Sequence, residues 1–341
     1  MKKKKYQGIR RRWFCLLLFC LILCSNSGCS KIKEEKRPNE DLTEITMVLD
    51  GTPNTAHSGL YVAMKKGYFE KEGLDVTVVE PPEDGAASMV AAGEAEFGIG
   101  YQNELAENFS SDAQLPVAAV ATLLQHNQIG FISLMRHDIN TPANIPDHMV
   151  AVSDDVIEQT IIRTLIEQGG GDFSLVKMEE TYIDDVAKTL RSGSQVVLGN
   201  YGWDGIACER QGMEIHYMAW RDLNEIFDYY GPLLLANTEF LTEQPDMAKG
   251  FVNAVRQGYQ DAVMNPGEAA DLLLEQVPDL DEGLVDSSQR YMSQQYTADS
   301  MAFGVIDEER WNRFYNWINE MGFYQTPIPE GIGFTNEYLE E

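Results

Sequence analysis

Short apolar strand candidates alternate with helical segments along this chain, and this alternation restricts the fold more than any other feature of the sequence. Near the start, Ile45–Leu49 reads as a strand, Ser58–Lys66 has the apolar spacing of a helix, and Asp75–Glu80 reads as a second strand. A helix over Gly85–Ala92 and a strand over Glu96–Tyr101 extend the series. Strand-helix-strand units build parallel sheets covered by helices, so we predict an α/β fold.

The same rhythm starts again after two further strand candidates, Val117–Leu124 and Ile129–Met135. In this second series we expect a strand at Ser174–Met178 and a helix at Trp203–Gln211. An apolar run at Pro232–Ala236 could return the chain to the first sheet. A chain of 341 residues is long enough for two lobes. We place residues 44–134 and 233–341 in lobe 1, and residues 135–232 in lobe 2.

The first 28 residues differ from the rest of the chain. They carry seven of the 26 Lys and Arg residues and no acid. These basic residues precede an apolar run, Trp13–Cys24, that is too short to span a bilayer comfortably. Small residues then precede Cys29, a pattern typical of a bacterial lipoprotein signal peptide in which Cys29 becomes the lipid-modified first residue. An ordinary cleaved signal peptide and an N-terminal anchor helix are the alternatives. All three place the remaining chain outside the cytoplasmic membrane, and the mixed charges of residues 29–43 indicate a flexible tether.

The charge and the cysteines exclude several classes of function. The chain has 54 Asp and Glu against 26 Lys and Arg, a net charge of −28, and such a surface repels nucleic acids. Beyond Cys29 the chain keeps only Cys208, so it has no internal disulfide and no zinc site built on thiolates. We predict no metal site. The sequence also lacks the Gly-x-Ser-x-Gly and His-Glu-x-x-His motifs of common hydrolases.

Polar residues follow the first three predicted strands. Because parallel sheets bind ligands at the carboxyl ends of their strands, three segments should converge on one cleft: Asp50–His57, Pro81–Gly85 and Tyr101–Glu104.

Three stretches carry a resemblance to a known family. They are Leu49–Ala63 with the Lys66–Val76 region after it, Gly93–Gly98 on the third strand, and Phe334–Leu339 near the C-terminus. Together they resemble the thiamine-pyrimidine family, which groups fungal pyrimidine synthases with bacterial solute-binding lipoproteins of ABC importers. The match covers roughly residues 45–339.

The resemblance implies a type II periplasmic-binding fold, in which a ligand cleft lies between two α/β lobes. It further implies a binding protein of the formylaminopyrimidine type, which captures a thiamine pyrimidine precursor and passes it to an ABC permease and its ATPase. We expect a membrane-anchored monomer on the extracytoplasmic face, with no cofactor and no enzymatic activity. The alternatives are a binder of another solute, either a riboflavin-like heterocycle or a sulfonate or nitrate type of ligand, and a pyrimidine-precursor synthase.

By the same resemblance, residues from both lobes contact the ligand. A tyrosine ring would stack on it, and carboxylates would accept hydrogen bonds from its amino groups. The candidate ligand-binding residues are Asn54, His57, Tyr101, Gln102, Glu104, Tyr201 and Asp204.

Most of these residues also have a purely structural interpretation. Asn54 would cap a helix, His57 would face solvent, and Glu104 would be an acid favoured at a helix N-terminus. Trp203 reads as core of its lobe. Gly51 departs from the family pattern, since relatives usually carry Trp there to stack on the ligand.

The synthase alternative needs residues that this chain lacks. The synthases carry a lysine for pyridoxal phosphate and a reactive histidine where this chain has Gly100 and Glu104, and a cysteine cluster where it has residues 228–232. Without the amine no Schiff base forms, so we expect a binding protein.

Overall fold

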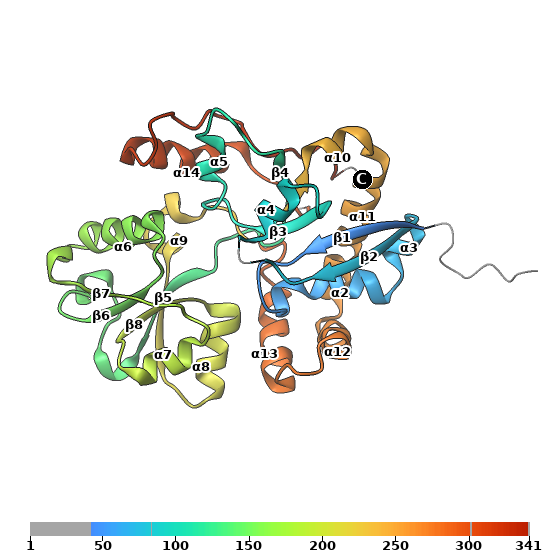
Figure 1. The fold of residues 1–341 in the computed structure, drawn as a ribbon. Helices are drawn as coiled ribbons and strands as arrows, with labels where there is room; N and C mark the ends of the chain where they lie inside the picture. The colour runs from blue at the N-terminus through green and yellow to red at the C-terminus, as the bar shows by residue number, and fades with distance from the viewer. Residues whose placement is uncertain (1–41, 83, 301, 340–341) are drawn as a thin grey trace, which may run out of the picture. The chain divides into compact units, whose positions relative to one another are not determined.

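The computed structural model describes residues 42–82, 84–300 and 302–339 (Figure 1). The predicted signal peptide, the predicted lipid site at Cys29 and all but the end of the predicted tether lie outside the described residues. Within the described ranges, no helix is both long and apolar enough to cross a membrane.

The first sheet has five strands in the order β2-β1-β3-β10-β4. β1 runs parallel to β2 and β3, which confirms the parallel unit expected near the start of the chain. β10 is antiparallel to both β3 and β4, so the apolar run after Pro232 does return the chain to this sheet. The strands are β1 (Thr43–Val48), β2 (Leu74–Val79), β3 (Phe97–Gly100), β4 (Val117–Thr122) and β10 (Leu233–Asn237).

The second sheet has the order β7-β6-β8-β5-β9. It contains β5, which we had expected in lobe 1. β5 pairs antiparallel with β8 on one side and with β9 on the other, so the second lobe begins before Ile129 rather than at residue 135. An apolar strand pattern shows burial but not which sheet buries it. The strands are β5 (Ile129–Leu134), β6 (Met149–Val152), β7 (Lys177–Glu180), β8 (Val196–Asn200) and β9 (Ile215–Ala219).

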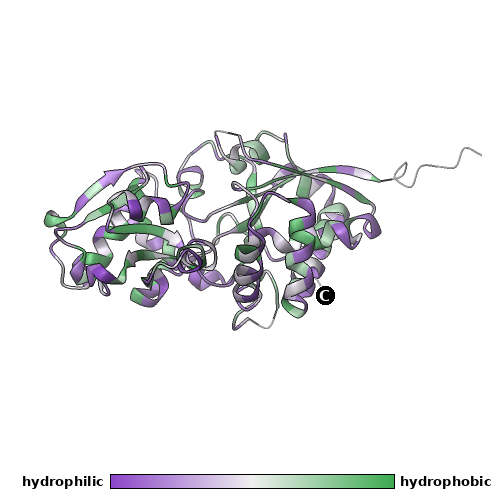
Figure 2. Ribbon diagram, turned by 90° about the horizontal axis from the view of Figure 1, so that it is seen from below, coloured by the Kyte–Doolittle hydropathy of each residue, from purple (hydrophilic) through white to green (hydrophobic). Residues whose placement is uncertain are grey.

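Helices cover both faces of the first sheet. The longest, α11, has Pro at its start and buries Phe251, Val255 and Tyr259 along one side, next to α2 (Figure 1). Figure 2 shows hydrophilic and hydrophobic residues alternating along the outer helices. The helices are α2 (Ser58–Lys65), α3 (Tyr68–Lys71), α4 (Ala86–Ala91), α5 (Ala106–Phe109), α10 (Thr238–Glu243), α11 (Pro245–Met264), α12 (Pro266–Gln276), α13 (Glu282–Met292) and α14 (Glu308–Met321).

The second lobe has one long helix, α6, together with short helices and several single turns. Asp155 caps α6 by accepting the Ile157 N–H at 2.7 Å. The expected strand at Ser174–Met178 lies slightly later, because Asp172 caps a 3₁₀ turn, η4, just before β7. The helices are α6 (Val156–Gln168), α7 (Val186–Ser192), α8 (Ile206–Arg210) and α9 (Trp220–Leu223), and the short turns are η2 (Met135–His137), η3 (Pro142–Asn144), η4 (Phe173–Leu175), η5 (Tyr201–Gly205) and η6 (Glu225–Phe227). A further short turn, η1 (Thr55–His57), lies in the first lobe between β1 and α2.

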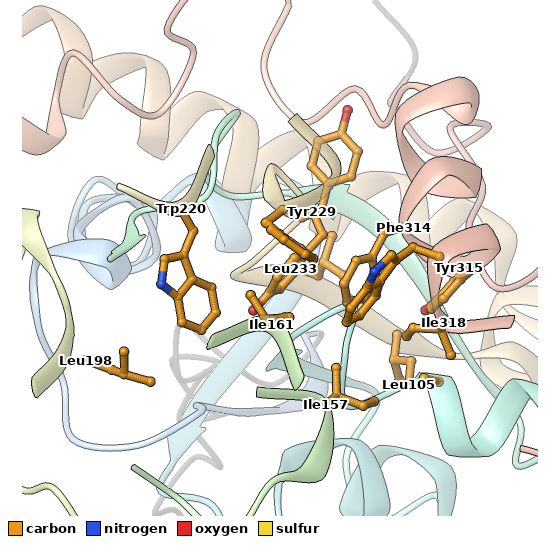
Figure 3. Packing of buried hydrophobic residues seen from close by; sticks show 14 of the residues in the cluster. Leu105, Ile157, Ile161, Leu198, Trp220, Tyr229, Leu233, Phe314, Tyr315 and Ile318 are labelled. Carbon is orange, nitrogen blue, oxygen red and sulfur yellow. The ribbon is translucent and has the colours of Figure 1, made fainter. Parts of the chain in front are cut away.

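One apolar core extends from the second lobe into the first. Ile161 and Trp220 belong to the second lobe and Leu233 to the first, and all three lie in one buried cluster (Figure 3). Two segments cross between the sheets: residues 123–128, between β4 and β5, form the first crossing, and residues 228–232, between η6 and β10, form the second. Tyr229, on the second crossing, stacks on Phe314 with 4.3 Å between ring centroids. These contacts assign Tyr229 to packing between the lobes rather than to the ligand cleft.

A charged network joins the two crossings. Asp228 of the second crossing accepts the Asn127 N–H at 2.9 Å and pairs with Arg310 at 3.0 Å. His126 of the first crossing lies between Asp228, at 2.7 Å, and Asp299, at 2.9 Å. The hydrogen bond to Asp228 raises the pKa of His126, which partial burial and the Arg310 charge oppose.

Candidate functional site

A cavity of about 330 Å³ opens between the ends of strands from both sheets. Asp50, two residues after β1, and Tyr101, directly after β3, belong to its first-lobe wall. Asn200, at the end of β8, and Asp204, four residues later, belong to its second-lobe wall. Two of the three segments expected at the cleft, Asp50–His57 and Tyr101–Glu104, contribute lining residues, as expected for loops at the carboxyl ends of parallel strands. The third expectation was wrong, because no described residue of Pro81–Gly85 lines the cavity. The remaining lining residues are Gly51, Thr52, Asn54, Thr55, Ala56, Leu124, Gln128, Ile183, Gly202, Trp203, Pro232 and Met292.

Asp50 is the centre of a hydrogen-bonded group in the first lobe. His57 Nε2 lies 2.8 Å from Asp50 Oδ1, and the Tyr101 hydroxyl donates to Asp50 Oδ2 at 2.7 Å. The Asn54 N–H donates to His57 Nδ1 at 3.1 Å. Because Nδ1 accepts this hydrogen bond, the ring proton is on Nε2, which donates to Asp50. The group therefore orients one carboxylate at the cavity wall.

The environment of Asp50 keeps it ionised. Burial raises its pKa, but the hydrogen bonds that it accepts from His57 and Tyr101 outweigh this effect, so the net pKa is lowered. Burial, and then the nearby Asp50 charge, raise the pKa of Tyr101 well above its ordinary value. Its hydroxyl therefore stays protonated and remains a donor.

The candidate residues of the first lobe are distributed between the cavity and its supporting structure. Asn54 lines the cavity, and its side chain also caps η1 by accepting the Ala56 N–H at 2.8 Å. His57 is fully buried behind Asp50 rather than facing solvent. Gln102 is fully buried as well, with its amide bonded to Trp311 O at 2.8 Å and to Tyr230 N at 2.9 Å.

Glu104 lies beside the cavity without lining it. Its Oε2 accepts the Tyr101 N–H at 3.2 Å. Loss of hydration against the surrounding protein, followed by the Asp50 and Asp155 charges, raises the pKa of Glu104 to about 7. Because its side chain remains exposed to solvent, screening weakens these effects.

In the second lobe the expected helix at Trp203–Gln211 begins with a π-helical turn, η5, from Tyr201 to Gly205. Such turns are frequent at functional sites. Here the turn directs Trp203 and Asp204 into the cavity. Trp203 was expected in the core of its own lobe, but it packs against a buried cluster of the first lobe that includes Tyr61 and Leu273, and it supplies an aromatic wall of the cavity.

Asp204 and Tyr201 lie on the same turn, but they have different surroundings. Asp204 Oδ2 accepts the Asn200 N–H at 2.8 Å, and burial raises the pKa of Asp204 to about 6. The Tyr201 ring packs against Tyr217 and Tyr291, each with 5.1 Å between centroids, and its hydroxyl points to Glu209, 3.3 Å away. Tyr201 is therefore part of the support behind the cavity and does not line it.

A second hollow of about 670 Å³ adjoins the cavity and shares Ile183, Asn200 and Asp204 with it. Its wall is acidic, and the loop between β7 and α7 forms one side, including Tyr182, which is 90% exposed. The acidic lining residues are Asp154, Glu158, Glu180, Asp184, Asp185 and Asp204.

Gly51 leaves open space in the cavity wall. A Cβ atom added at this position would meet no atom within 4 Å. A ligand or a neighbouring side chain can therefore occupy the space that a larger residue would fill. Among the described residues, no group of three or more His, Cys, Asp or Glu could hold a metal ion.

The candidate set derived from the sequence omitted Asp50 and Gln128, which both line the cavity. Asp50 lies within the strand-end segment expected at the cleft, so its position was available as a signal. Gln128 lies on the first crossing, and its amide Oε1 accepts the Tyr291 hydroxyl at 3.0 Å. No motif marks it.

Comparison with known proteins identifies relatives over most of the chain. Residues 54–269 match the family model described as NMT1/THI5 like. The formylaminopyrimidine-binding protein of Halalkalibacterium halodurans is 26% identical over 87% of this chain and 91% of its own length. The riboflavin-binding protein RibY of Chloroflexus aurantiacus is 23% identical over 87% of this chain and 86% of its own length.

Pyrimidine phosphate synthases also match this chain. A pyrimidine phosphate synthase of Saccharomyces cerevisiae, THI11, is 20% identical over 87% of this chain and 88% of its own length. Among solved structures, the alkanesulfonate-binding protein SsuA of Xanthomonas axonopodis pv. citri superposes with a TM-score of 0.66 and 10% identity, covering 86% of this chain and 98% of its own. This similarity confirms the two-lobed periplasmic-binding fold.

Proposed function

The chain belongs to the NMT1/THI5-like family, and from this premise we propose that it is the solute-binding lipoprotein of an ABC importer. It would capture a thiamine pyrimidine precursor outside the cytoplasmic membrane, anchored by lipid at Cys29, and deliver it to a permease and ATPase as a monomer. The cavity between the lobes carries this proposal. Its aromatic and acidic walls match the flat face and the amino groups of an aminopyrimidine.

Each wall would have a distinct part in binding. Tyr101 and Trp203 supply aromatic surface, Asp204 accepts hydrogen bonds, and Asp50 holds a fixed negative charge. Asn54 would add polar contacts at the same wall. Gln102, His57, Glu104 and Tyr201 would act from behind or beside the cavity, by fixing the residues that touch the ligand.

The negative charge of the cavity wall argues against one class of alternative ligand, the anions. Its charged lining residues are both Asp, so a sulfonate or nitrate ligand would have no cationic partner there. A riboflavin-like ligand remains an alternative, because the adjoining hollow offers further space.

The synthase alternative finds little support in the cavity. The described residues that line it include no Lys, His or Cys, so none of these side chains could form a Schiff base with pyridoxal phosphate. Binding followed by release, with no covalent step, fits these residues.

Calorimetric titration tests the proposal. The protein without its first 29 residues, whose described part belongs to one compact unit, would be titrated with aminopyrimidines, riboflavin and an alkanesulfonate. We expect saturable binding of an aminopyrimidine, and stronger binding of this ligand than of the other two. Tighter binding of the sulfonate, or no binding of any of the three, would disprove the assignment.

A further inference from the structure

We propose that this cleft selects a ligand with a positive charge: a flat heterocycle bearing a protonated primary amine, in preference to the neutral N-formylated form of the same molecule. The inference rests on the proposed function and narrows the class of ligand. It follows from the charge, the hydrogen bonding and the connection of the two hollows at the site.

The first step concerns the charged groups that face the ligand. Asp50 and Asp204 are the charged residues lining the cavity, and the charged residues lining the adjoining hollow are all Asp or Glu. Among residues 42–82, 84–300 and 302–339, no Lys, Arg or His lines either space. A cation that enters therefore meets attraction from every charged wall group, and an anion meets none.

The second step concerns which carboxylate is available. Both oxygens of Asp50 already accept hydrogen bonds, from His57 and from Tyr101. In Asp204, only Oδ2 has a donor among the described residues, the Asn200 N–H at 2.8 Å. Its Oδ1 can therefore accept a hydrogen bond from the ligand. Asp204 lines both spaces, so it lies where a ring in the cavity would extend a substituent into the hollow.

The third step concerns the acids of the hollow. Only Asp184 among them pairs with a cation of the described chain, Lys188 at 3.4 Å. Glu158 accepts the hydroxyl of Ser153 at 2.8 Å, which leaves its charge uncompensated. These acids are not a site by themselves, but they add negative potential around the substituent that Asp204 would bind.

An ammonium group and a formamide place similar atoms at Asp204 but differ by one full charge. A charge-assisted hydrogen bond is roughly twice as strong as a neutral one. We therefore expect the amine to bind at least about tenfold more tightly, which corresponds to about 1.4 kcal/mol.

Paired titrations test this inference. The protein without its first 29 residues would be titrated at pH 7 with 4-amino-5-aminomethyl-2-methylpyrimidine and with its N-formyl derivative. Asp204→Asn keeps the size of the side chain and removes its charge, so the ratio of the two affinities should fall toward one. The matched control, Glu243→Gln, changes an exposed acid on α10 and should leave the ratio unchanged. Added salt should weaken binding of the amine only.

The outcomes separate this inference from the proposed function. Equal or tighter binding of the formylated ligand, or an unchanged ratio in Asp204→Asn, would overturn the charge selection while the pyrimidine-binding function stands. Binding of neither ligand would overturn both.

Discussion

Asp204 and Tyr201 lie three residues apart, yet only the carboxylate of Asp204 reaches the cavity. We predict that Asp204→Ala weakens ligand binding by more than about tenfold, the loss of a charge-assisted contact. Tyr201→Phe should bind normally, because the hydroxyl it removes points to Glu209. Tyr201→Ala should weaken binding through lost packing on Tyr217 and Tyr291. Calorimetry measures all three, and normal binding by both alanine variants would show that the cavity is not the ligand site.

His57 acts on the ligand through Asp50. His57→Ala removes a fully buried ring, so we expect the free energy of unfolding to fall by about 2–5 kcal/mol. It also leaves Asp50 with a single side-chain donor, Tyr101, and should weaken ligand binding. Urea denaturation and calorimetry give the two values. His57→Gln keeps a donor and should recover part of both losses. Unchanged ligand affinity in His57→Ala would show that the hydrogen bond from His57 to Asp50 does not contribute to ligand binding.

Individual residues of the site were only partly predictable. The strand-end rule led to the segment that contains Asp50 and to Tyr101, because the position after a parallel strand determines where a side chain starts. It could not assign Gln102, whose amide is bonded to Tyr230 and Trp311, residues far away in the sequence. Nor could it separate Tyr201 from Asp204, because the direction of each side chain depends on a π-helical turn.

Among the elements, η5 depends on close packing inside the turn. A Cβ atom on Gly205 would lie 2.5 Å from the Tyr201 ring, which cannot move aside without displacing the turn. We predict that Gly205→Ala destabilises the protein by about 1–3 kcal/mol and weakens ligand binding. Gly267→Ala is the control, because its added Cβ meets no atom within 4 Å. Thermal denaturation compares the two, and equal melting temperatures would contradict the packing argument.

The stability of the protein should depend on pH through His126, which links the two crossings. Its pKa is raised by the hydrogen bond to Asp228, so the stability that it contributes is complete below its ordinary pKa of 6.5. This contribution is lost as the pH rises through the higher pKa of the folded state. The stability difference between the wild type and His126→Gln should therefore shrink from pH 6 to pH 8. Urea denaturation at both values tests this, and a constant or growing difference would rule out protonation of His126 as its source.

The elements were better predicted than their assignment to sheets. The helical apolar spacing of the sequence predicts helices at Val156–Gln168 and Pro266–Gln276, and α6 and α12 have these bounds because the signal is local. β7 was misplaced by a few residues because its Lys177–Glu180 sequence is largely exposed and lacks a strand-like apolar pattern. β5 was given to the wrong lobe because its partners, β8 and β9, lie far along the chain.

At the scale of the whole molecule, the two lobes meet along several surfaces. The crossings and the shared apolar core join them on one side of the cavity. α13 joins them elsewhere, where the Ser288 hydroxyl bonds to both Thr55 and the carbonyl of Gly202. A ligand in the cavity would contact both lobes at once, so its binding energy would favour a closed arrangement of the lobes.

The central claim is that this cavity holds a small flat heterocycle without forming a covalent bond. A crystal structure of the protein with 4-amino-5-aminomethyl-2-methylpyrimidine tests it most directly. We predict the ring between the walls formed by Tyr101 and Trp203, with an amino group within hydrogen-bonding distance of Asp204. A ligand bound outside the cavity, or a cofactor attached covalently to the chain, would contradict the claim.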